Sequence, residues 1–222
     1  MPAPGPDPTV SGMRGSILAV ATHLFAARGY AGTSLQAIAD AVGVRKPSLL
    51  HPFSSEGAIR DAALDSLLSH WRERLPQVLT AATTGRDRFD GVLREVIGFF
   101  DAEPDRARLL VREVLDRPGE MRAQFAPCMS LLTSYIDQGR EAGRIHTAVD
   151  AEAYVTEVIL LAVSHFALGP ASQAVDPDPA RAPRTGDWEA RRLAELRRLC
   201  STALVRARPD SHVAASTAGM DR

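Results

Sequence analysis

The sequence predicts an all-α fold, and three observations lead to that prediction. Apolar residues recur three and four positions apart over most of the chain, a spacing that places them on one face of a helix. No stretch alternates apolar and polar residues as a half-buried strand does. Gly and Pro residues interrupt the pattern at intervals that suit helices of ordinary length. The 222 residues, 45% of them hydrophobic, are enough for a packed core in one or two domains.

The N-terminus predicts a disordered arm followed by one long helix. Residues 1–12 are rich in Pro, Gly and Ser, a composition that buries too little apolar surface to fold. After this arm, an apolar stripe at helical spacing predicts a first helix that ends at Arg28 and Gly29. The members of the stripe are Ile17, Leu18, Ala21, Leu24 and Phe25.

Two short helices are expected next. Thr33 and Gln36 have the spacing of a capping box, which predicts a second helix of about 8 residues ending at Gly43. Pro47 suits the first turn of a third helix, where its missing N–H costs nothing, and Pro52 must end that helix just before it. The third helix is therefore little more than one turn and a half.

The rest of the chain predicts longer helices. Ser54 and Ser55 can cap a fourth helix that has Glu56 in its first turn. The helix at 150–168 is apolar almost all round, which predicts burial on two sides. Residues 207–222 are expected to be a disordered tail. The Gly and Pro breaks bound the later helices at residues 86–102, 104–116, 119–142, 150–168 and 187–206.

Two short helices joined by a Gly turn and preceded by a longer helix predict a helix-turn-helix unit. It covers about residues 34–53, within a DNA-binding domain of residues 13–55. Val44, Leu49 and Phe53 can anchor the third helix from behind. The N-terminal end of that helix is then left exposed, as entry into a DNA major groove requires.

The exposed side chains of this unit predict several kinds of DNA contact. Arg45 or Lys46 can donate to guanine or to phosphate, and Ser48 can donate to either. Pro47 can contact a thymine methyl group, while His51 can donate to a phosphate or simply cover the turn. At the start of the second helix, the Ser34 hydroxyl, the Gln36 amide and free backbone N–H groups can bind a phosphate. The predicted DNA-binding residues are Ser34, Gln36, Arg45, Lys46, Pro47, Ser48 and His51.

The segment from Ile17 to about Leu64 resembles the DNA-binding domain of the TetR/AcrR family of transcriptional regulators. The resemblance lies in the motifs LFAARGY, TS, IA, AVGV and F-x-S, which follow one another in that order. It implies an all-helical homodimer in which three N-terminal helices bind DNA and a helical C-terminal domain, here residues 56–206, binds an effector. It also implies that the last two long helices, 150–168 and 187–206, form a four-helix dimer interface with their mates.

Some positions depart from the family pattern. Arg45 stands where family members usually have a small polar cap, and Leu50 and His51 stand where they usually carry an aromatic residue. Glu56 stands where a lysine typically supports a backbone contact. Residues 1–70 hold five cations and five acids, so DNA binding would release few counterions. Base contacts and dimer symmetry must then supply more of the affinity.

Apolar and aromatic residues of the later helices predict an effector site. They lie on faces that can line a cavity between the fourth and eighth helices, although the same residues would suit an ordinary core. Tyr135 and His165 are the expected polar contacts, and the effector expected in such a site is a small apolar or amphipathic molecule. The predicted ligand-binding residues are Trp71, Phe100, Met121, Phe125, Met129, Tyr135 and His165.

The sequence gives little support to other classes of function. It has no nucleophile-elbow, zinc-protease or phosphate-loop motif, and Glu113 and Asp116 are interpreted as solvated charges, so an enzyme is not expected. Cys128 and Cys200 have no partners at metal-ligand spacing, so no metal or cofactor is expected. No apolar run approaches the length of about 18 residues that a membrane span needs, and no signal peptide is recognisable, so a cytoplasmic location without a membrane partner is expected.

The residues and the resemblance together predict a transcriptional regulator. The favoured form is a repressor that binds a palindromic operator as a homodimer and is released by a small ligand. The fourth helix, which runs from the DNA-binding domain toward Trp71, is the expected lever. An alternative is a helical small-ligand-binding or protein-interaction dimer in which DNA binding is weakened or lost, with Glu56 as its sign. A helical enzyme is the third possibility.

Overall fold

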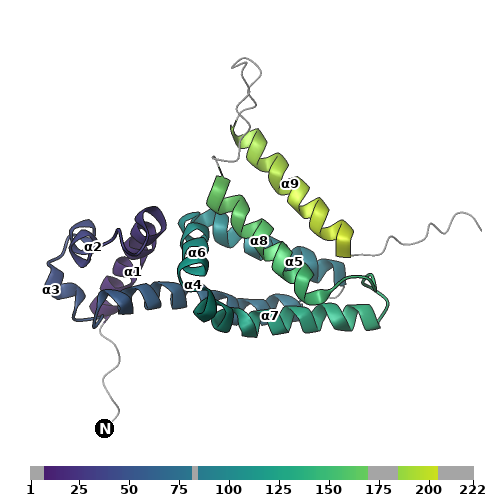
Figure 1. Ribbon diagram of the computed structural model, residues 1–222, viewed down its shortest axis with the longest axis horizontal. Coiled ribbons are helices and arrows are strands. Elements are labelled where there is room, and N and C mark those ends of the chain that lie inside the picture. Colours follow the sequence, from purple (N-terminus) through teal and green to yellow (C-terminus); the bar gives the residue numbers. More distant parts are fainter. Residues whose placement is uncertain (1–7, 82–84, 170–184, 205–222) are drawn as a thin grey trace, which may run out of the picture.

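The computed structural model describes residues 8–81, 85–169 and 185–204, and every regular element within these ranges is a helix. Figure 1 shows a small N-terminal cluster at one end of the molecule and a larger helical body beside it. The all-α prediction is confirmed. In chain order the helices are α1 (Pro8–Arg28), α2 (Leu35–Val42), α3 (Lys46–Leu49), α4 (Glu56–Ala81), α5 (Gly85–Ala102), α6 (Asp105–Asp116), α7 (Pro118–Glu141), α8 (Ala151–Leu168) and α9 (Thr185–Leu204).

Helix α1 corrects the predicted N-terminal arm. The helix begins at Pro8, so residues 8–12 are helical and not part of a disordered segment. Proline suits the first position of a helix, because the N–H that it lacks would have no partner there. Residues 1–7 of the predicted arm and the whole predicted tail, residues 207–222, lie outside the described residues.

The start of α2 also differs from the prediction. The N-cap is Ser34, whose Oγ accepts a hydrogen bond from the Ala37 N–H at 3.2 Å. Thr33 is buried, and its hydroxyl donates to the Gly29 carbonyl at 2.9 Å. The predicted capping box therefore fails, because the Thr33 hydroxyl is drawn to an unpaired carbonyl at the end of α1. The Gln36 amide donates along its own helix to Asp40.

Helix α4 links the two parts of the molecule. Its Ile59 and Ala63 belong to the core of the N-terminal cluster, together with Phe25 of α1 and Leu49 of α3. Further along, Leu67 belongs to a core of the larger body. At 26 residues α4 is about 39 Å long, so one continuous helix reaches from one domain deep into the other (Figure 1).

Helix α8 corrects the expectation about apolar runs. Its 18 residues, Ala151–Leu168, have a mean hydropathy of 1.4, so by length and composition alone the helix could cross a membrane. In the structure it packs against α6 and α7. It also packs against α5 and α9, and Leu160, Leu161 and Leu168 remain exposed in the single chain.

Candidate DNA-binding surface and effector cavity

Helix α3 is held as a helix-turn-helix unit requires. Gly43 has a φ of 80°, a conformation that glycine adopts without strain, and it turns the chain between α2 and α3. Leu49 is fully buried and Phe53 nearly so, while Val44 packs against the same core. These are the three anchors expected from the sequence. Since α3 has only four residues, its position depends on these contacts more than on its own hydrogen bonds.

The predicted DNA-binding residues lie on α2, on α3 and on the turns beside these helices, at one end of the molecule (Figure 1). Ser48 is half-buried, and the other six are exposed. The N-cap of α3, Arg45, makes no side-chain capping bond, so its guanidinium is not used to hold the helix. The sequence did not single out Leu50, which is 44% exposed directly after α3. An apolar side chain there can contact a thymine methyl group, as was expected of Pro47 alone.

Glu56 has a structural partner that the sequence did not reveal. Its Oε2 accepts a hydrogen bond at 3.2 Å from the backbone N–H of Leu35, the first residue of α2. Two N–H groups at the start of α2, those of Leu35 and Ala37, are thus already paired with side-chain oxygens. The prediction that backbone N–H groups at this helix end are free to bind a phosphate is therefore wrong for Leu35 and Ala37. The carboxylate also ties α2 to the first turn of α4.

Helix α6 provides a second link between the domains. It lies between α1 and α8 and packs against both (Figure 1). Arg112 donates from Nε to the Ala26 carbonyl at 2.8 Å, near the end of α1. Asp105 Oδ2 lies 2.6 Å from His23 Nδ1 of α1. Burial acts to raise the pKa of Asp105, but hydrogen bonds from His23 and Arg108 outweigh burial and lower it.

A buried carboxylate fastens α4 to the start of α7. Glu113 is only 1% exposed, and it accepts from Arg60 Nε at 2.6 Å and from Arg117 Nη2 at 2.6 Å. Arg117 also contacts Asp61 at 2.8 Å. Burial acts to lower the pKa of Arg117, but its hydrogen bonds to Asp61 and Glu113 raise it above the usual value. The interpretation of Glu113 as a solvated charge is wrong, because Arg60, distant in sequence, and Arg117, four residues further along the chain, compensate its burial.

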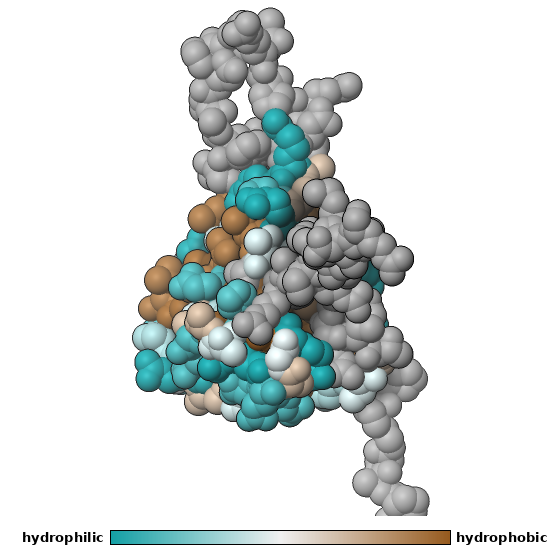
Figure 2. All heavy atoms as spheres, turned by 90° about the vertical axis from the view of Figure 1, so that its right-hand side faces the viewer, coloured by the Kyte–Doolittle hydropathy of each residue, from teal (hydrophilic) through white to brown (hydrophobic). Residues whose placement is uncertain are grey.

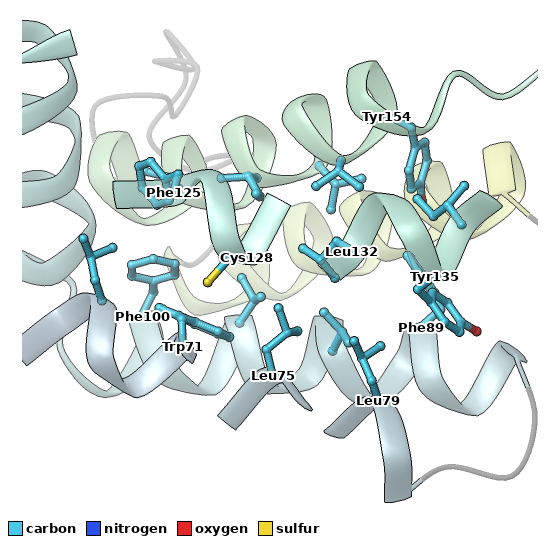
Figure 3. A pocket seen from close by; sticks show the side chains of 18 of the residues that line it. Trp71, Leu75, Leu79, Phe89, Phe100, Phe125, Cys128, Leu132, Tyr135 and Tyr154 are labelled. Carbon is cyan, nitrogen blue, oxygen red and sulfur yellow. The ribbon is translucent and has the colours of Figure 1, made fainter. Parts of the chain in front are cut away.

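The larger body contains a partly open cavity of about 120 Å³, lined mainly by α4, α5, α7 and α8 (Figure 3). Four of the predicted ligand-binding residues line it: Trp71, Phe100, Phe125 and Tyr135. Apart from Phe100, the sequence did not single out the contributions of α5, nor those of the outer turns of α4. Helical periodicity identifies apolar faces but not which of them borders a void. The additional wall residues include Leu75, Leu79, Phe89, Val92, Cys128 and Leu132.

The other three predicted ligand-binding residues are not in the cavity wall, which corrects that part of the prediction. Met121 is 1% exposed and fills a core beside α4. Met129 packs against the second core of this body. His165 is buried, and its ring meets the edge of Phe166 at 4.8 Å between centroids. All three lie on apolar faces that serve packing, which is the ordinary use of such faces.

Comparison with known proteins agrees with this architecture. The family described as "Bacterial regulatory proteins, tetR family" matches residues 17–63, which hold α2, α3 and parts of α1 and α4. The chain is 27% identical over 137 residues to the HTH-type transcriptional activator FasR of Mycolicibacterium smegmatis, a match that covers 59% of this chain and 63% of FasR. The chain thus spans less than two thirds of that relative.

Two further similarities cover more of the chain. It is 24% identical over 160 residues to the HTH-type transcriptional repressor KstR2 of Rhodococcus jostii, which covers 68% of this chain and 77% of that protein. The structure of the ketosteroid transcriptional regulator KstR2 of Mycobacterium tuberculosis superposes with a TM-score of 0.68 at 16% identity, over 87% of this chain and 95% of the other. The helix-turn-helix domain and the helical fold thus point to the same family. Residues 17–63 thus form a DNA-binding domain of the TetR family of transcriptional regulators, and the helical fold of the rest of the chain is TetR-like.

Proposed function

We propose that this regulator is a ligand-released repressor that binds a palindromic operator as a homodimer in the cytoplasm. The observation that supports this most is the exposure of Arg45, Lys46 and Pro47 at the start of the four-residue helix α3, whose buried side is anchored by Leu49. In this proposal Arg45 and Lys46 donate to guanine or phosphate and Pro47 contacts a thymine methyl. Ser34, Gln36, Ser48 and His51 complete the contacts, chiefly to the DNA backbone.

Exposed leucines on the last two helices support a dimer. Leu160, Leu161 and Leu168 of α8 and Leu199 of α9 are between 42% and 55% exposed in the single chain. Figure 2 shows apolar side chains gathered on one flank, at the level of α8 and α9 in Figure 1. A second copy that covers this flank would form a four-helix interface. The two α3 helices of such a dimer must then lie about 34 Å apart, one turn of DNA, to read a palindrome.

The effector cavity and the DNA-binding domain share structural elements. Trp71 of α4 and Leu110 of α6 both line the cavity, and both helices also contribute to the core that holds α1 and α3. A ligand can bind more tightly to a conformation of the dimer in which the two α3 helices are wrongly spaced for the operator. Such a ligand lowers the operator affinity, and the size of the effect is set by the difference between its affinities for the two conformations. Of the relatives named above, FasR is an activator and KstR2 is a repressor. That this chain acts as a repressor is therefore part of our proposal.

The first test is a gel shift with DNA from the protein's own promoter region at two salt concentrations. We expect salt-sensitive retardation, and a double substitution Arg45→Ala, Lys46→Ala should weaken specific binding at least roughly tenfold, since each good base contact contributes about 1–3 kcal/mol. The matched control is Arg122→Ala, Arg144→Ala, which removes two exposed cations from the larger body. Equal effects of the two double substitutions would contradict the role given to α3.

Glu56 favours a second candidate function, a helical small-ligand-binding or protein-interaction dimer with weak or absent DNA binding. Its carboxylate sits at the N-terminus of α2, where it repels the phosphate that this helix end would otherwise attract. Absence of salt-sensitive retardation at either salt concentration would favour this candidate. The apolar flank of α8 and α9 would then serve dimerisation alone.

A further inference from the structure

The wall of the effector cavity carries no charge. Within the described residues, none of the 21 that line it is Asp, Glu, Lys, Arg or His. Only four have a heteroatom in the side chain, and one of these, Tyr154, already donates its hydroxyl to the Cys200 carbonyl at 2.7 Å. Burial raises the pKa of the Cys128 thiol, against an opposing effect of Arg72, so this side chain stays neutral. An ion inside the cavity would find no residue of opposite charge in this wall.

The cavity is also long and narrow. Its wall on α4 extends from Leu67 to Leu79, about 18 Å along the helix axis, and its wall on α7 extends from Phe125 to Ile136, about 16 Å. Figure 3 shows Phe125 toward one end and Tyr135 at the other, with Leu75 and Leu132 between the two ends. A volume of about 120 Å³ spread over such a length suits an extended chain better than a fused ring system.

We infer that the effector is an uncharged molecule with an extended, unbranched hydrocarbon chain, of the fatty alcohol or fatty ester class. This inference rests on the proposed ligand-released function and names the ligand class of the same cavity. Each buried methylene group should strengthen binding about fourfold, from the usual transfer free energy. A fatty acid must enter as its protonated form, which is only about one molecule in a thousand at pH 7.3.

The test compares decan-1-ol with decanoic acid, which have equal chain lengths. Binding is followed by the fluorescence of Trp71 in a Trp188→Phe background, since the sequence has only these two tryptophans. The alcohol should bind with one dissociation constant from pH 6 to pH 8. The apparent dissociation constant of the acid should rise about tenfold for each pH unit. Acid binding that equals alcohol binding and does not change with pH would overturn the inference, as would failure of the alcohol to bind.

A matched pair of substitutions places a cation inside or outside the wall. Leu132 lines the cavity, whereas its neighbour Leu131 is exposed. Leu132→Arg should allow ionised decanoate to bind and flatten the pH dependence, while Leu131→Arg should leave the preference for the alcohol intact. If Leu132→Arg does not fold, the inference is tested by measuring the affinities of a series of alcohols, from hexan-1-ol to dodecan-1-ol, for the protein without this substitution. Affinity should rise about fourfold per methylene until the channel is full, and a flat series would contradict the inference.

Operator release separates this inference from the proposed function. If decan-1-ol leaves operator DNA bound while an ionised fatty acid or another charged ligand releases it, the ligand class is wrong and ligand-released repression stands. If the protein retards no operator, the proposed function fails, and the fluorescence titrations still decide which ligand class the cavity accepts.

Discussion

The DNA-binding domain and the effector domain are both helical, but they use their interiors differently. In the first, Ile17, Ile38, Leu49 and Ile59 are completely buried in a single continuous core. In the second, two separate cores flank a cavity. A domain that reads DNA must hold one short helix in a fixed position, which close packing achieves. The domain that we propose to receive a ligand gives up part of that packing to the cavity.

The largest effect should come from the junction between these two regions. Glu113→Ala leaves Arg60 and Arg117 without their shared buried acceptor, and we expect a loss of about 3–5 kcal/mol in the free energy of unfolding, measured by urea denaturation. The control is Asp116→Ala, which removes a half-exposed partner of Arg60. It should cost no more than about 1 kcal/mol. Equal costs would mean that the buried carboxylate does not fasten α4 to the start of α7.

A pair of enlarged side chains tests the contrast between the two interiors directly. Ala39→Leu adds volume to the filled core of the DNA-binding domain and should destabilise it by about 1–3 kcal/mol, because the neighbours must move. Cys128→Leu adds volume at the cavity wall and should be neutral or raise stability by up to about 1 kcal/mol, because space is available. Thermal unfolding measures both. A similar loss for both variants would remove the distinction between the two domains.

The smallest effect concerns the charge at the start of α2. Glu56→Lys replaces a carboxylate bound to the Leu35 N–H with a cation that can contact phosphate. Non-specific DNA affinity should rise up to about tenfold near 0.1 M salt, and the salt dependence should steepen by about one phosphate contact. Fluorescence anisotropy against salt concentration measures both quantities. Glu73→Lys, at an exposed position on α4, makes the same charge change elsewhere and should have little effect.

Local sequence patterns were enough to predict the helices and the way in which α3 is anchored. The limits of α3 follow from Pro47 and Pro52, and its buried side follows from the spacing of Leu49 and Phe53. The roles of Glu56 and Glu113 could not be predicted in this way. Their partners, Leu35 and Arg60, lie on other helices, so these pairings exist only after the helices have packed.

The cavity was predictable as a class of site but not in its details. Trp71, Phe100, Phe125 and Tyr135 were identified because they lie on apolar helical faces. Met121, Met129 and His165 lie on such faces too, but the structure uses them for packing. Whether an apolar face meets another helix or an empty space depends on how neighbouring helices cross, and the spacing of residues along one helix does not contain that information.

The continuity of α4 has a consequence for how this protein can change over generations. Each residue of an α-helix turns the next by about 100°, so one residue inserted between Ala63 and Leu67 would rotate the cavity-lining half of α4 away from its cavity. Only insertions close to whole numbers of turns, such as about seven residues, would keep both faces in phase. Chimeras that exchange ligand-receiving domains between relatives should therefore succeed when the junction preserves this helical phase.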